Sequence, residues 1–197
     1  MAKDVLEYLV DGTSGLVTGS VGGCIVTGIC TKGTVGKGYL LGNRSDLEDM
    51  LGEGVLVDRL KDMFLTGGQN PLVVAVPVEP SEPGEISTVL HIGSSPLLNV
   101  SGEPYSAKTY RVKILKSGER NEGTYSINSG SVSTIPVDGI AFIDGIAINF
   151  PEGTYAAGDV YSFFTTAPKA SIVNVMQALE KPLELYDTEF VYITGES

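Results

Sequence analysis

The residues in this sequence that could carry out chemistry are few and scattered. The glycine-rich stretch Gly33-Thr34-Val35-Gly36-Lys37-Gly38 contains the Gly-Lys pair of a phosphate-binding loop. Such a loop also needs a glycine at position 31 and a serine or threonine at position 38 to bind Mg²⁺, but the sequence has Thr31 and Gly38. We therefore predict a turn at this stretch rather than a nucleotide site.

No catalytic or metal-binding constellation is recognisable. The only histidine, His91, lies in an apolar segment and is interpreted as a structural residue rather than a base. No serine has the Gly-x-Ser-x-Gly context of a hydrolase nucleophile. The closely spaced carboxylates are expected on solvent-facing helix surfaces: Glu48 with Asp49, and Asp58 with Asp62. We therefore expect no catalytic residues, no cofactor and no metal, and predict that the chain is not an enzyme.

The two cysteines are Cys24 and Cys30, in a segment that is predicted to be a strand. Six residues of strand span about 20 Å. The Cα atoms of a disulfide lie within about 7 Å of each other. Two free, buried thiols are therefore expected, as is typical of a protein made in a reducing cytoplasm.

Composition indicates a globular, acidic protein. Hydrophobic residues are 42% of the 197 residues and charged residues 19%, which excludes a disordered chain. No apolar run approaches the length of a membrane span and no signal peptide is visible, so no membrane partner is expected. With a net charge of −11, no nucleic-acid partner is expected, because phosphate binding needs a basic surface.

One basic stretch departs from this acidic background. Residues 108–123 contain five basic and two acidic residues, a net charge of +3. On a strand, Arg111 and Lys113 point to the same side. Two interpretations stay open: a solvated strand face, or a contact with an acidic surface, which another copy of this chain could supply. The candidate subunit-interface residues are Lys108, Arg111, Lys113, Lys116 and Arg120.

Helical signals lie near both ends of the sequence. Ser45 and Glu48 form a capping box that predicts a short helix ending near Gly52 or Gly54. A second helix is predicted over 55–66, where Gly67-Gly68 and Pro71 end it. Its apolar face is predicted to consist of Leu56, Leu60, Met63 and Phe64. A third helix begins after Ser171, with Ile172, Val175, Met176 and Leu179 on one face, and Pro182 ends or kinks it.

Strand signals fill the rest of the chain. Apolar runs at 24–30, 39–41, 72–76 and 190–193 predict strands beside the helices. After an acidic linker at 79–85, residues 86–166 show no helical period. Asp144-Gly145 predicts a two-residue hairpin there. The strands expected in this region are 88–92, 110–115, 124–128, 140–143, 146–150 and 160–165.

The order of these elements predicts an α+β fold. Residues 1–83 and 169–197 are expected to form a mixed α/β core domain. Residues 84–168 are expected to form an antiparallel, all-β domain inserted into it.

Several of these segments, in this order, resemble the tail sheath proteins of Mu-like contractile-tailed phages. They are Gly38–Gly42 with Asp46–Gly54, Val55–Leu60 through Gly68 to Val78, Ala157–Pro168, and Glu189–Ile193. Members of that family are longer, and this chain resembles their N-terminal half. The resemblance implies a structural subunit that self-assembles as stacked rings around a tail tube and slides on contraction. The partners that it implies are copies of the chain itself and tail tube or baseplate proteins. The location that it implies is the virion tail, after synthesis in the cytoplasm of the bacterial host.

Two other classes of function are considered. The β domain could be a phage-derived binding module that recognises a host surface, a carbohydrate or another tail protein. The sequence lacks tryptophan, a frequent platform for sugars. A small enzyme would need a pocket in which polar groups converge.

Overall fold

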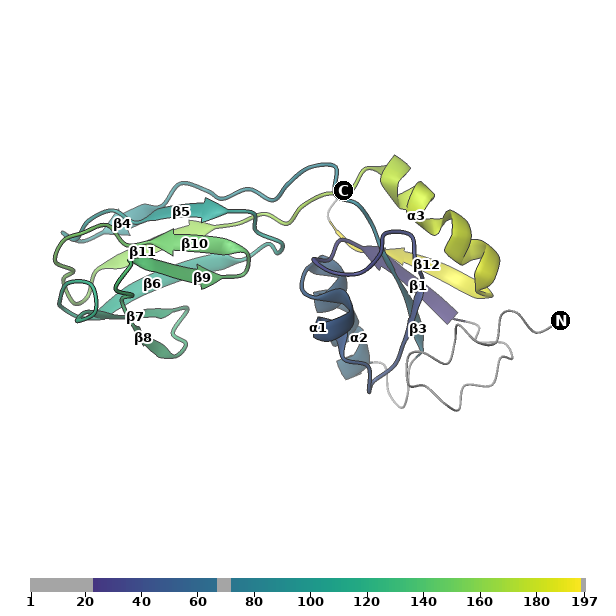
Figure 1. Ribbon diagram of the computed structural model, residues 1–197, viewed down its shortest axis with the longest axis horizontal. Coiled ribbons are helices and arrows are strands. Elements are labelled where there is room, and N and C mark those ends of the chain that lie inside the picture. The colour runs from purple at the N-terminus through teal and green to yellow at the C-terminus, as the bar shows by residue number, and fades with distance from the viewer. Residues whose placement is uncertain (1–22, 67–71, 196–197) are drawn as a thin grey trace.

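The computed structural model describes residues 23–66 and 72–195. The expected helix stops at Gly67, Gly68 and Pro71 lie outside the described residues, as does the part of the core domain at 1–22. Two units are visible (Figure 1): a helix-containing core and a unit made of strands, connected by two chain segments. About 18% of the chain is helix and 36% strand, and the predicted α+β fold is confirmed.

The core is built on a four-stranded sheet in the order β12-β1-β3-β2. β12 and β3 both pair with β1 in parallel, and β2 pairs with β3 antiparallel. β1 and β3 are buried along their whole length because helices cover both faces of the sheet. The strands are β1 (Gly23–Gly28), β2 (Tyr39–Leu41), β3 (Val73–Pro77) and β12 (Thr188–Ile193).

Helices α1 (Leu47–Leu51) and α2 (Val55–Thr66) pack on one face of this sheet, and α3 (Ile172–Leu185) packs on the other. The predicted bounds of α2 are confirmed. Leu60 is fully buried, as predicted, whereas Phe64 is only partly buried and lies at the margin of the cluster.

The predicted capping residue of α1 was wrong by one position. Asp46, not Ser45, is the N-cap, and its Oδ1 accepts a hydrogen bond of 3.0 Å from the Asp49 amide. Ser45 instead accepts a 3.0 Å hydrogen bond at Oγ from the Gly42 amide, which closes the preceding turn. Because the Ser45 hydroxyl is used in that turn, Asp46 caps the helix one residue later, and α1 ends at Gly52 with a positive φ of 73°.

The buried face of α3 also differs from the prediction. Val175 and Leu179 are buried, together with Ala178, but Ile172 and Met176 are exposed. Pro182 does not end the helix, which continues to Leu185 with the proline ring buried. Ala178 belongs to the cluster between α3 and the sheet, so the contact face runs along Val175, Ala178 and Leu179 rather than through Ile172 and Met176. An apolar part of α3 therefore faces outward.

The inserted unit is a sandwich of two antiparallel sheets. The five-stranded sheet has the order β4-β11-β6-β7-β8 and the three-stranded sheet the order β5-β10-β9. The larger sheet contains β4 (Leu90–Ile92), β6 (Thr109–Lys116), β7 (Thr124–Ile127), β8 (Val132–Thr134) and β11 (Val160–Phe164). The smaller contains β5 (Asn99–Gly102), β9 (Ile140–Ile143) and β10 (Ile146–Asn149). The short, largely exposed β5 and β8 were not predicted.

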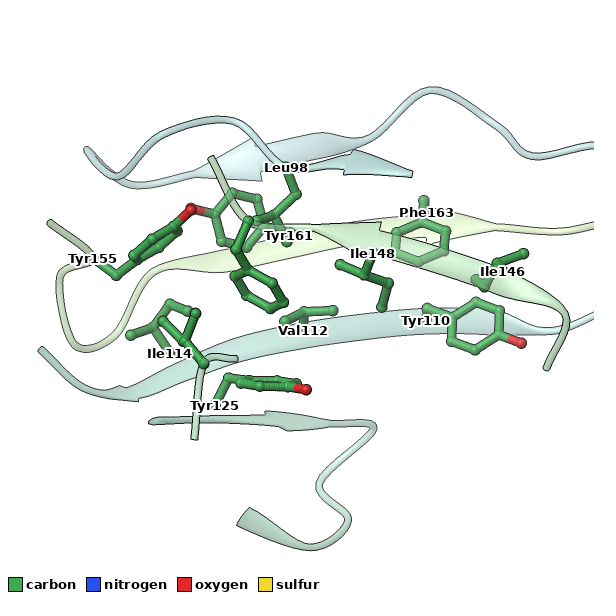
Figure 2. Packing of buried hydrophobic residues seen from close by; sticks show 12 residues of the cluster. Leu98, Tyr110, Val112, Ile114, Tyr125, Ile146, Ile148, Tyr155, Tyr161 and Phe163 are labelled. Atoms are coloured by element: carbon green, nitrogen blue, oxygen red, sulfur yellow. The ribbon is translucent and has the colours of Figure 1, made fainter. Parts of the chain in front are cut away.

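Side chains from both sheets fill the space between them. Figure 2 shows the side chains of Tyr110 and Val112 on β6 facing Ile146 and Ile148 on β10. The ring of Tyr110 stacks on Phe163 with centroids 5.0 Å apart. This core is separate from the two clusters that flank the sheet of the α/β core.

The predicted hairpin at Asp144-Gly145 is confirmed. Both residues have positive φ, 50° and 79°, as a two-residue type I′ turn requires. They connect β9 to β10, which pair antiparallel.

The two connecting segments between the units are hydrogen-bonded to each other. The Ser81 amide donates to the Lys169 carbonyl at 2.8 Å, and the Lys169 amide donates to the Glu82 carbonyl at 3.0 Å. The segment 84–168 thus leaves and re-enters the core at one place. The domain boundaries at 83/84 and 168/169 stay predictions.

Candidate functional site

The basic stretch begins on β6, whose side chains alternate between the sandwich core and the outside. Tyr110, Val112 and Ile114 are buried, whereas Arg111 and Lys113 are exposed on the opposite face of the sheet. Among the described residues, no carboxylate lies within ion-pair distance of either cation. Their charges are therefore unneutralised by this part of the chain.

Lys116 and Lys108 lie at the two ends of this strand. Lys116 is exposed, next to an irregularity in the pairing of β6 with β7. Lys108 precedes β6, and its Nζ lies 3.1 Å from Asp144 Oδ1. The hydroxyl of Tyr110 donates to the other oxygen of Asp144 at 2.6 Å. Burial, together with this hydrogen bond, raises the pKa of Tyr110. Lys108 therefore has an acidic partner, Asp144, within the chain.

Arg120 has a structural position. Its Nε and Nη2 donate to the Phe150 carbonyl at 2.9 and 2.6 Å, and Nη1 lies 4.0 Å from Glu152 Oε1. The five candidate residues therefore do not form one site. Arg111 and Lys113 lie together, Lys116 lies at the end of the same strand, and Lys108 and Arg120 have partners within the chain.

Exposed apolar side chains flank the two cations. In the sheet register Arg111 lies opposite Ser162 of β11, which lies opposite Leu90 of β4. Lys113 lies opposite Val160 of β11, which lies opposite Ile92 of β4, and Ile92 is 78% exposed. The outer sheet face consists of Leu90, Ile92, Arg111, Lys113 and Phe164. Its combination of apolar area and unpaired positive charge suits an acidic protein surface.

A groove of about 440 Å³ lies between the two sheets, near Lys108. Phe142, which is 81% exposed, and the buried Tyr110 contribute to its lining. Both carboxylate oxygens of Asp144 already have partners, so they offer a ligand little free hydrogen-bonding capacity.

A serine, a histidine and an aspartate come together elsewhere in the β unit, which the sequence did not predict. Asp159 is buried, and its Oδ2 accepts hydrogen bonds from the Ser94 amide at 2.9 Å and the Ser95 amide at 2.8 Å. Ser95 Oγ donates to the same oxygen at 2.5 Å. Hydrogen bonds from Ser95 and Ser94, chiefly that of the Ser95 hydroxyl, lower the pKa of Asp159.

This cluster is not arranged as a catalytic triad. Ser95 Oγ gives its hydrogen to the carboxylate and accepts one from the Ala156 amide at 2.8 Å. His91 Nε2 lies 3.6 Å from Asp159 Oδ2, and its ring stacks on Tyr161 at 4.3 Å. His91 Nε2 has no hydrogen-bond partner among the described residues, so the histidine is not positioned as the base of a triad. The cluster instead connects the loop after β4 to the start of β11, some 64 residues later in the sequence.

The remaining candidates are also structural. The stretch 33–38 forms a turn in which the Lys37 amide donates to the Thr34 carbonyl at 3.1 Å. Both cysteines are free; Cys24 is buried as expected, but Cys30 is only partly buried. Burial raises the pKa of Cys30 to about 11. Among the described residues, no group of three or more His, Cys, Asp and Glu side chains could hold a metal ion.

The chain belongs to the DUF2586 family: residues 2–197 match the description "DUF2586, N-terminal domain". No curated protein matches the chain. One similar solved structure is the sheath tail protein from Desulfitobacterium hafniense, with 11% identity and a TM-score of 0.43. That likeness covers 90% of this chain but only 43% of the solved chain, and a likeness at this level does not establish a shared fold. None of the described helices is long and apolar enough to cross a membrane.

Proposed function

We propose that this member of the DUF2586 family is a structural subunit of a phage or prophage contractile tail sheath. In this proposal it assembles with copies of itself around a tail tube, in the virion tail, and performs no catalysis. The ordered segments that resemble Mu-like sheath proteins support the assignment. Tail tube and baseplate proteins are its further proposed partners.

The observation that carries the proposal is the outer sheet face. Arg111 and Lys113 are unpaired among the described residues, and exposed apolar side chains flank them. The whole chain has a net charge of −11, so a second copy is a ready source of acidic surface. Opposite charges on two copies steer their encounter, while the apolar area adds affinity once they meet.

Sedimentation of the double variant Arg111→Glu/Lys113→Glu tests this proposal. We expect concentration-dependent association of the wild type that weakens as salt is added, because screening acts beyond about 8–10 Å. The double variant should associate more weakly and depend less on salt. Lys37→Glu/Arg44→Glu, which reverses two exposed cations of the core, is the matched control and should behave as the wild type. Equal association of all three proteins would remove the outer sheet face from the assembly.

The groove between the sheets favours a second candidate, a binding module for a host surface or another tail protein. Its exposed Phe142 offers an aromatic platform beside serine hydroxyls. Titration of the chain with host-cell surface carbohydrates, observed through chemical shifts of residues that line the groove, tests this candidate. Shifts that a Phe142→Ala variant abolishes would support it, and unchanged spectra would count against it.

A further inference from the structure

We infer that the outer sheet face of one copy binds the exposed side of α3 on the next copy. The inference rests on the proposed self-assembly and names the surface that receives the cations. The receiving surface is a row of exposed side chains at four-residue spacing, here called the α3 ridge. It consists of Ile172, Met176, Glu180 and Glu184.

The α3 ridge combines apolar area with negative charge. Met176 is 67% exposed, although it lies on a helix whose other face is packed on the sheet. Glu180 and Glu184 follow it at successive turns, and neither forms an ion pair within the described residues. Like charges four residues apart destabilise a helix slightly, so cations from a partner would relieve this repulsion.

Three of the acids on the opposite side of the core sheet already have partners within the chain. Glu48 pairs with Lys61 at 2.6 Å, and Glu53 accepts a hydrogen bond from the hydroxyl of Tyr105. Asp58 accepts one from the hydroxyl of Ser106 at 3.2 Å. These contacts engage three of the carboxylates near α1 and α2 within the chain. The two acids of the α3 ridge have no ion pair among the described residues and follow the exposed Met176 at successive turns of one helix, which makes them the match chosen here over the exposed Asp49 and Asp62.

The spacing of the two surfaces also agrees. Side chains two residues apart on a strand are separated by about 6.6 Å. Side chains four residues apart on a helix are separated by about 6 Å along its axis. If α3 lies along β6, Glu184 can face Lys113 while Glu180 faces Arg111.

At the next outward-facing position of β6 and of the α3 ridge, the same arrangement brings apolar side chains together. On the sheet, the residue two positions before Arg111 is Thr109, which lies opposite Phe164 of β11. On the helix, the residue four positions before Glu180 is Met176. Phe164 is 56% exposed, so Met176 can cover it in this arrangement. Two charge pairs and one apolar contact thus match in a single register.

The two surfaces lie on different units of the chain (Figure 1), α3 on the core and the outer sheet face on the inserted sandwich. We place the contact head to tail, as stacked rings around a tube require: each copy offers one surface to the preceding copy and the other to the next. Such contacts generate closed rings or open helical arrays rather than two-fold dimers.

A charge-swap experiment with the 197-residue chain tests this pairing. The first variant is Arg111→Glu/Lys113→Glu, the second is Glu180→Lys/Glu184→Lys, and the third combines all four changes. In sedimentation velocity at low salt, the association constant of each double variant alone should be at least about tenfold lower than that of the wild type. An equimolar mixture of the two doubles, and the quadruple variant alone, should recover association, because each then matches opposite charges.

Asp49→Lys/Asp62→Lys reverses two exposed acids on the other side of the core sheet and is the control for the acidic surface. It should associate as the wild type does. Circular dichroism and thermal melts of each variant show that the fold is intact before association is compared.

The outcomes separate the inference from the function it rests on. If the basic double variant loses association while Glu180→Lys/Glu184→Lys retains it, the α3 ridge is not the receiving surface, although self-assembly stands. If both doubles lose association but neither the mixture nor the quadruple variant recovers it, the pairing is also wrong. If the wild type stays monomeric at the highest concentration, both the inference and the proposed assembly fail.

Discussion

Replacement of Leu60 by alanine should destabilise the α/β core and leave the β unit folded. Leu60 lies on α2, is fully buried, and belongs to a cluster separate from the sandwich core. The substitution removes three carbon atoms, each worth about 0.8 kcal/mol in transfer free energy, or about 2.4 kcal/mol in total. The cavity left behind adds to this, so we expect a loss of about 3–4 kcal/mol in unfolding free energy.

Urea unfolding followed by circular dichroism can measure this loss in each unit. All helices of the described chain belong to the core, so the helical far-UV signal reports on that unit. Buried tyrosines of the sandwich, such as Tyr110 and Tyr161, provide a near-UV signal for the other. With m-values of about 1–3 kcal/mol/M, the helical midpoint should fall by about 1–4 M, while the tyrosine midpoint stays in place.

Leu65→Ala on the same helix is the matched control. Leu65 is 84% exposed, so its truncation should change stability by less than about 0.5 kcal/mol. A cost below about 1 kcal/mol for Leu60→Ala would refute the packing of α2 on the sheet. Equal shifts of the helical and tyrosine signals would refute the independence of the two units.

Three further predictions concern the connections between units, the buried carboxylate and a thiol. Limited proteolysis should cut first at 79–85 or 167–170, and early cuts confined to 110–165 would contradict a separable β domain. The pKa of Asp159 is lowered in the fold, so its contribution to stability is present above an unfolded pKa of about 3.9 and is lost as pH falls through the folded value. Asp159→Asn should therefore lower the melting temperature at neutral pH and flatten its fall on acidification; a parallel fall in both proteins would contradict this. Because burial raises the pKa of Cys30 to about 11, from an ordinary 9.0, its alkylation near pH 8 should be about a hundredfold slower than in the urea-unfolded chain, and equal rates would count against that burial.

The sequence predicted those features whose signals are local. The alternation along β6 placed Arg111 and Lys113 outside and Val112 inside, because a strand has a period of two. The two residues Asp144-Gly145 specify their own turn, since both adopt positive φ. The predicted bounds of α2 followed from its apolar face together with the stop signals Gly67-Gly68 and Pro71.

Features that depend on distant residues could not be predicted in this way. β8 is short, polar and exposed, and it is a strand only because it pairs with β7. The exposed side of α3 depends on Ala178 packing on the sheet in place of Met176, which the apolar period alone does not contain. Asp159 meets Ser95 only after β11 has paired with β4, and a lone Ser-Ser or Gly-Asp pair in the sequence gives no sign of it.

The sequence predicted only part of the candidate interface, because the partners of its cations lie far away in the sequence. The sequence shows all five basic residues, but which of them are free to bind another molecule depends on their partners within the fold. Lys108 and Arg120 are engaged by Asp144 and the Phe150 carbonyl, both well separated in the sequence. The unpaired acids of the α3 ridge were not singled out at all, because their importance depends on the exposed Met176 beside them.

Electron microscopy of the concentrated protein at low salt tests the central claim most directly. The proposal of a self-assembling tail sheath subunit predicts ordered rings or tubes for the wild-type chain. It also predicts that these assemblies are lost in Arg111→Glu/Lys113→Glu and return in the quadruple charge-swap variant. Dispersed single particles of the wild type at the highest attainable concentration, with no ordered assembly, would contradict the claim.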